Sequence, residues 1–193
     1  MEEQFYRHEL TQLIRSTPWF MSILETVRAC NPPDWLVGAG VIRTLVWDHL
    51  HRYQTPTPLA DIDVNFYDPI DVRPERDHLV QEQLAQRLPL VNWEATNQVA
   101  VHLWYEDVFG FAVPALLSSE EAVGTWPETA TCVAVRLLAT DQIHIVAPYG
   151  LSDLFHMILR RNSSRVTREQ FAQRLHSKQI LRKWPRVQVF YDA

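Results

Sequence analysis

The stretch WLVGAGVIRTLVWDHLHRY, residues 35–53, joins a short apolar run to an amphipathic segment through two glycines. The apolar run is typical of a buried strand, and the spacing of the apolar residues after it predicts a helix over 41–53. Gly38 and Gly40 allow the backbone between them to approach a ligand closely, and a helix N-terminus attracts anions. The turn therefore suits a phosphate. If the turn stood alone, close strand–helix packing would be the better explanation, because the turn matches neither G-x-G-x-x-G nor a P-loop.

A second apolar run, ADIDVNFYD at residues 60–68, carries two aspartates, Asp61 and Asp63. Residues two apart in a strand share a face, so these carboxylates repel each other unless a cation such as Mg²⁺ compensates them. A turn at the start of the strand or a solvated face is the alternative explanation. The glycine turn lies about 20 residues upstream across one helix, the separation that a right-handed strand–helix–strand unit needs.

A third carboxylate would complete a two-metal site. Glu94 is the candidate, because it lies in LVNWEAT (90–96) between Trp93 and Ala95, which we expect to face inward. An ordinary solvent-facing residue is the alternative. The eight histidines contain no H-x-x-x-H pair on one helix, so zinc is not indicated.

The remaining pattern predicts an α+β fold, a mixed sheet flanked by helices, with further helices at the C-terminus. We expect one domain over 1–193, made of N-terminal helices (1–33), a core of sheet and helices (34–150) and basic C-terminal helices (151–193). The expected elements are two helices within 4–30, a helix at 73–88, a hairpin of strands 90–96 and 100–106, a hairpin of strands 132–138 and 142–148, and helices at 151–162 and 167–185.

Composition places the chain among ordinary globular proteins, with 47% hydrophobic and 21% charged residues. The acidic N-terminus is not typical of a signal peptide, and no apolar run is long enough for a membrane span. Cys30 and Cys132 match no metal spacing, and we interpret them as reduced thiols of a cytoplasmic protein. The net charge of -5 argues against broad nucleic-acid binding, although residues 154–193 are basic.

These motifs resemble the nucleotidyltransferase signature of the DNA polymerase β superfamily, and in particular the head of CCA-adding enzymes and poly(A) polymerases. The chain is also similar to a family of small bacterial nucleotidyltransferases with no assigned acceptor. The similar stretches span roughly residues 35–187 and are GVIRTLVWDHLH, DIDVNFYD, NWEATNQVAVHLW, TWPETATCVAVRL, APYGLSDLF and RKWP. The family turn has two adjacent small residues, Gly-Gly or Gly-Ser, whereas Ala39 separates the glycines here.

The resemblance implies Mg²⁺ or Mn²⁺ held by Asp61, Asp63 and Glu94, and a nucleoside triphosphate held by Gly38, Gly40 and Arg43. The register to Arg43 fits the family if Gly40 is the second glycine, and Arg43 comes one residue late if Gly38 is the first. The acceptor could be a small molecule, an RNA 3′ end or a protein side chain, and the oligomeric state is open.

A catalytically inactive nucleotide-binding or interaction module is the alternative to an enzyme, because the GAG turn is irregular. Further candidates for contact with the triphosphate are Tyr149, Asp153 and the basic stretch HSKQILRKWPR (176–186), with Lys178 or Arg182 as phosphate partners. A solvated helix face is the preferred explanation for each of them. Asn97 and Gln98 could recognise a base or a sugar hydroxyl, and a hairpin turn is the other interpretation.

Overall fold

In the computed structural model, which describes residues 1–191, a five-stranded mixed sheet has the order β3-β2-β1-β4-β5. Its strands are β1 (Leu36–Gly38), β2 (Ile62–Phe66), β3 (Trp93–Asn97), β4 (Ala134–Leu137) and β5 (Ile143–Val146). β2 and β3 are parallel, and the other neighbouring strands are antiparallel. This sheet, flanked by helices, confirms the predicted α+β class.

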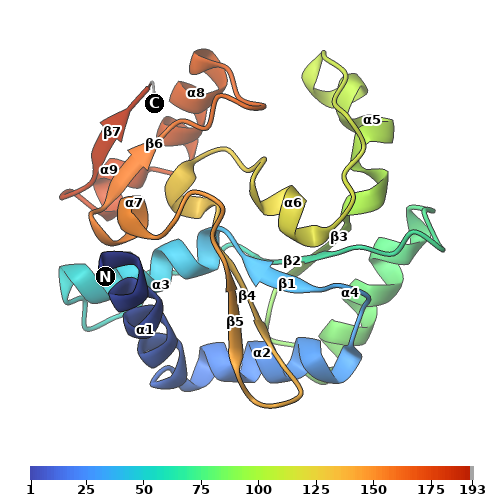
Figure 1. The fold of residues 1–193 in the computed structure, drawn as a ribbon, viewed down its shortest axis with the longest axis horizontal. Helices are drawn as coiled ribbons and strands as arrows, with labels where there is room; N and C mark the ends of the chain where they lie inside the picture. The colour runs from blue at the N-terminus through green and yellow to red at the C-terminus, as the bar shows by residue number, and fades with distance from the viewer. Residues whose placement is uncertain (192–193) are drawn as a thin grey trace.

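One face of the sheet packs on helices from the first half of the chain (Figure 1). These are α1 (Glu2–Arg15), α2 (Pro18–Cys30) and α4 (Glu75–Arg87). The apolar residues Ile62, Val64 and Phe66 of β2 lie in the same buried core as Val27 of α2 and Leu84 of α4. Because side chains alternate along a strand, Asp61, Asp63 and Asn65 lie on the opposite face.

The opposite face lies beneath the later part of the chain, with α5 at one side and α8 at the other (Figure 1). Helix α3 (Gly40–His51) connects β1 to β2, and its Trp47 Nε1 donates a 2.9 Å hydrogen bond to Leu154 O. The other elements are η1 (Gln98–Ala100), α5 (Val101–Phe109), α6 (Ser119–Val123), η2 (Thr129–Thr131), α7 (Ser152–Phe155), β6 (Ile158–Arg160), α8 (Arg168–Ser177), α9 (Ile180–Lys183) and β7 (Gln188–Phe190). No helix within residues 1–191 is both long and apolar enough to cross a membrane.

The predicted hairpin after Glu94 is wrong, because residues 101–109 form helix α5 and not a strand. The Asn97 side chain accepts a hydrogen bond from Val99 N and donates to the carbonyls of Asp68 and Asp71. These bonds end β3 and start a helical turn. Val101, Tyr105 and Phe109 then follow at helical spacing, a period that the short apolar run did not distinguish from a strand.

Three further expectations differ from the structure. Strands β1 and β2 are antiparallel, so they do not form the expected right-handed unit; the ten residues after α3 allow the chain to enter β2 from the opposite end. The helix expected at 151–162 ends after Phe155, because Met157 is left-handed (φ 55°) and β6 pairs with β7. The helix expected at 167–185 starts with the predicted capping box but divides at Gln179, also left-handed (φ 52°).

Candidate active site

The two glycines of the turn between β1 and α3 differ in the space around them. A Cβ added to Gly38 would lie 2.6 Å from Val133 O and 2.7 Å from Ala134 Cβ, so Gly38 permits close packing of β1 on β4. A Cβ on Gly40 would meet no atom nearer than Arg43 Nη2 at 3.8 Å, because Gly40 lines an open cleft. Ala39 has a positive φ of 57°, a strained conformation of the kind that gathers at ligand sites.

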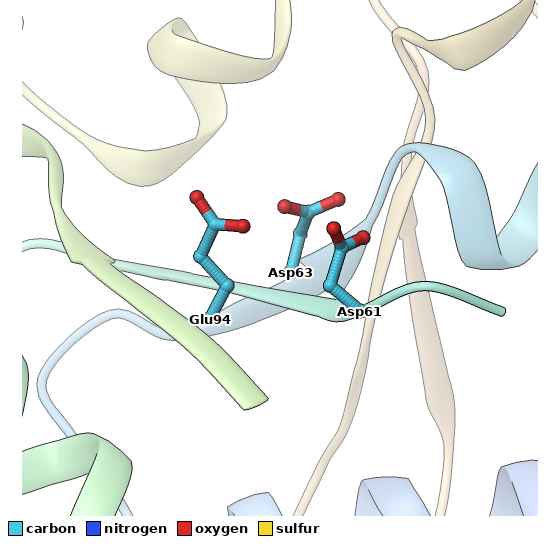
Figure 2. A group of neighbouring side chains, drawn as sticks. All are labelled: Asp61, Asp63 and Glu94. Atoms are coloured by element: carbon cyan, nitrogen blue, oxygen red, sulfur yellow. The ribbon is translucent and has the colours of Figure 1, made fainter. Parts of the chain in front are cut away.

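Three carboxylates meet on the open face of the sheet. Asp61 precedes β2, Asp63 lies within it, and the parallel register places Glu94 of β3 opposite Asp63. One oxygen of each carboxylate lies within 4.8 Å of the other two, and all three side chains point to the same side (Figure 2). We call Asp61, Asp63 and Glu94 the triad.

The triad creates an unfavourable concentration of negative charge. Burial of Asp63, together with repulsion from Asp61 and Glu94, raises the pKa of Asp63 to about 7, against the opposing effect of Lys178 and Arg174. Clustered carboxylate oxygens are the ligands that hard divalent cations such as Mg²⁺ and Mn²⁺ prefer. The side chains present therefore fit such a cation, which would remove the repulsion.

Positive side chains line the cleft next to the triad. This basic cleft is bordered by the glycine turn, Asp61, Asp63 and four cationic residues: Arg43, Arg174, Lys178 and Lys183. The helix α3 N-terminus opens into it through Gly40. A surface that places cations and a helix N-terminus beside carboxylates suits an anion bound together with a metal ion, as a nucleoside triphosphate is.

Arg43 lies against the rings of two tryptophans. Its guanidinium carbon lies 5.7 Å from the ring centroid of Trp47 and 5.1 Å from that of Trp184. Burial lowers the pKa of this guanidinium, its Nε atom has no hydrogen-bond partner, and no carboxylate within residues 1–191 pairs with it. Arginine stays charged under such conditions, so Arg43 offers unused donors to an anion in the cleft.

Of Tyr149, Asp153, Lys178 and Arg182, the structure brings only Lys178 to the basic cleft. Arg182 hydrogen-bonds to Gln179, Asp153 pairs with Arg160, and Tyr149 donates to Gly124 O. Lys183, which also lines the cleft, belongs to the basic stretch 176–186 that the sequence singled out, whereas reasoning from sequence missed Arg174. Arg174 is placed by an ion pair to Glu128 (2.9 Å), a contact between residues 46 positions apart that left no local pattern to read.

Comparison with known proteins identifies the family to which the chain belongs. The chain is similar to a solved structure described by the words "The NMR structure of the protein reveals a CCA-adding enzyme head domain", with 28% identity, a TM-score of 0.81 and 96% of each chain covered. No curated protein matches the chain significantly. A family model described as nucleotidyltransferase matches residues 25–189. Because this match covers most of the chain, the protein belongs to that nucleotidyltransferase family.

Proposed function

We propose that the protein transfers a nucleoside monophosphate from a nucleoside triphosphate to a hydroxyl group, with Mg²⁺ or Mn²⁺ held by the triad. The observation that carries this proposal is the position of the triad: three carboxylates within 4.8 Å, at the rim of a cleft lined by four cations. Family membership supports the reaction class.

The basic cleft would hold the triphosphate. Arg43, fixed between Trp47 and Trp184, would donate hydrogen bonds to phosphate oxygens, and Lys178 and Lys183 would add charge from the C-terminal helices. The free N–H groups at the start of α3 would bind a further phosphate oxygen without a serine hydroxyl. Asp61, Asp63 and Glu94 would keep the reacting phosphate beside them through the divalent cation, which neutralises phosphate charge and lowers the pKa of a hydroxyl.

The reaction needs no reactant other than the triphosphate and the hydroxyl acceptor, because one bond breaks for each bond that forms. The acceptor oxygen forms a bond to the α-phosphorus, the bond from that phosphorus to the bridging oxygen breaks, and pyrophosphate leaves while the hydroxyl proton passes to solvent. The chain's own contribution is to position the two substrates and to surround the departing pyrophosphate with the cations of the basic cleft.

The test is an assay with each of the four labelled ribonucleoside triphosphates, Mg²⁺ or Mn²⁺, and a cell extract as the source of acceptor. We expect pyrophosphate release and label transfer that depend on metal. Glu94→Gln should lose most of this activity, whereas Glu82→Gln, a matched change of an exposed residue on α4, should keep it.

The same assay distinguishes the enzyme from an inactive nucleotide-binding module. A protein that binds triphosphates without metal, with no turnover in any extract, would contradict the proposal. So would a fully active Glu94→Gln variant, because Glu94 would then lie outside the site.

A further inference from the structure

A second cavity lies on the triad's side of the sheet, between α5 and α8, with a volume of about 420 Å³. Asn65 and Thr96 form part of its floor, and they follow Asp63 and Glu94 by two residues on the same strand faces. We call this cavity the amide pocket. Its size is that of a small-molecule site.

The floor of the amide pocket has unused hydrogen-bonding groups on buried residues. Asn65 and Gln98 are 7% and 6% exposed, and Gln98 Nε2 donates a 2.7 Å hydrogen bond to Asn65 Oδ1. Within residues 1–191, Asn65 Nδ2 and Gln98 Oε1 have no partner. If both amides were reversed, one donor and one acceptor would still remain, so the floor can pair with a donor–acceptor edge such as that of a nucleobase.

One wall of the amide pocket is aromatic and contains a buried cation. Trp104 and Phe109 of α5 line it and are 41% and 43% exposed. Arg165 is only 8% exposed, lies 5.3 Å from the ring centroid of Tyr105, and has no ion-pair partner within residues 1–191. A buried guanidinium that forms no ion pair is suited to an anionic group on the ligand.

The charges of the amide pocket favour an anionic ligand over a positively charged one. Its lining includes Arg165 and Arg174 but no aspartate, glutamate or lysine, and amides and aromatic rings supply most of the rest. An amino sugar or polyamine would need acidic groups that this lining does not have. The lining instead fits a planar ring with a polar edge and a negative charge.

The amide pocket lies on the side of the triad from which an acceptor would come. The basic cleft, with the cations for pyrophosphate, is bordered by Asp61 and Asp63, whereas the amide pocket begins beyond Asp63 and Glu94 at Asn65 and Thr96. In phosphoryl-type transfer the attacking and leaving oxygens are roughly in line. Pyrophosphate leaving into the basic cleft therefore places the attacking hydroxyl toward the amide pocket.

We propose that the amide pocket binds the acceptor, and that the acceptor is a small planar heteroaromatic molecule with an anionic group and a hydroxyl, of the kind represented by a free nucleoside monophosphate. This assignment of the acceptor rests on the proposed function, although the pocket's ligand chemistry does not. Trp104 would stack on the ring, the Asn65–Gln98 pair would bind its edge, and Arg165 would bind the anion.

The test is calorimetric titration of the metal-free protein with the four ribonucleoside monophosphates, the corresponding nucleosides and ribose 5-phosphate. We expect at least one monophosphate to bind about tenfold more tightly than both its nucleoside and ribose 5-phosphate. Trp104→Ala should weaken that binding about tenfold through lost stacking. Trp19→Ala, a matched change of a tryptophan 36% exposed outside both cavities, should leave it unchanged.

Arg165→Gln should remove the preference for the monophosphate over the nucleoside. If this variant of a buried residue does not fold, the wild-type preference and Trp104→Ala still decide the matter. Equal binding by wild type and Trp104→Ala, or no monophosphate binding, would overturn the proposal. Binding of a short oligonucleotide alone, with no free nucleotide bound, would overturn it as well.

A last titration separates the acceptor from the base of the donor. With Mg²⁺ and an α,β-methylene nucleoside triphosphate, Trp104→Ala should leave the affinity unchanged; equal weakening of triphosphate and monophosphate would place the donor's base in the pocket and overturn the acceptor assignment. If the wild-type protein releases no pyrophosphate with any acceptor, the proposed function fails while the binding results still stand, so the two failures are distinguishable.

Discussion

The basic cleft and the amide pocket lie on the same sheet face and share Pro127 and Arg174, but they are built for different ligands. The basic cleft has a volume of about 110 Å³ and four cations, whereas the amide pocket has about 420 Å³ with amides and aromatic rings. The triad stands at the boundary. The difference indicates that charge recognition and ring recognition are divided between the two sides of the proposed reaction centre.

The two regions also differ in how the fold supports them. Arg43 is held by Trp47 and Trp184, which are almost fully buried in the main core. The amide pocket depends on α5, whose outer residues Leu103 and Val108 are both 63% exposed. The basic cleft is thus fixed by the core, and the acceptor side is built on a peripheral helix that can vary without disturbing the sheet.

The largest expected effect follows from Asp63→Asn. This substitution removes the central carboxylate of the triad, which lies between the basic cleft and the amide pocket. Loss of the central carboxylate should reduce turnover about a thousandfold or more, because the remaining triad residues no longer form a complete cation site. Pyrophosphate release measures this effect. Activity equal to wild type would show that the triad is not the reaction centre.

The same variant has a pH-dependent consequence for stability. The pKa of Asp63 is about 7 in the folded protein against an ordinary 3.8, so the folded state binds this proton more tightly and loses stability as the pH rises through that window. Without metal at pH 8, Asp63→Asn should therefore unfold several degrees above wild type, and the difference should vanish near pH 4. Thermal unfolding at both pH values checks this, and a lower unfolding temperature at pH 8 would contradict it.

Local signals predicted the triad's geometry better than the surroundings of the triad. Period-two alternation was enough to place Asp61 and Asp63 on one face, and the inward Trp93 and Ala95 turned Glu94 to the same side as the pair. The cation partners could not be found in this way. Arg174 reaches the cleft through Glu128, a contact that no sequence spacing records.

Of the elements around the amide pocket, helix α5 was predicted wrongly, as a strand. Residues 101–109 form a helix because Asn97 closes a turn with Asp68 and Asp71, two carbonyls supplied by a distant loop. Tertiary hydrogen bonds of this kind override a short apolar pattern. The position of the pocket's aromatic wall could therefore not be predicted from the sequence, since it depends on Trp104 and Phe109 lying on a helix.

A smaller effect should distinguish the basic cleft from the amide pocket. Arg43→Gln removes charged hydrogen bonds to the triphosphate, so we expect the KM for the triphosphate to rise about 10- to 100-fold. The affinity for a nucleoside monophosphate should not change, because Arg43 does not line the amide pocket. Steady-state kinetics and calorimetry measure the two quantities.

Arg182→Gln is the matched control for Arg43→Gln. Arg182 lies on α9 near the cleft but does not line it, and its side chain bonds to Gln179. The control should keep the wild-type KM. An equal rise in both variants would mean that general positive charge attracts the triphosphate, and the specific role of Arg43 would then be wrong.

The smallest effect concerns the wall that the two regions share. Glu128 is 4% exposed, and it accepts hydrogen bonds from Arg174 Nε at 2.9 Å and Thr131 Oγ1 at 2.8 Å. Glu128→Gln keeps the shape but removes the ion pair, so Arg174 should lose its fixed position between the two cavities. We expect the KM for the triphosphate and the Kd for the monophosphate each to rise about threefold, in kinetic and calorimetric measurements.

Asp153→Asn is the control for this shared wall, because it breaks the comparable Asp153–Arg160 pair away from both cavities. Both variants should lower the unfolding temperature, but only Glu128→Gln should weaken both ligands. If Glu128→Gln weakened the triphosphate alone, Arg174 would belong to the basic cleft only. The two regions would then be independent sites, joined by the triad and not by a common wall.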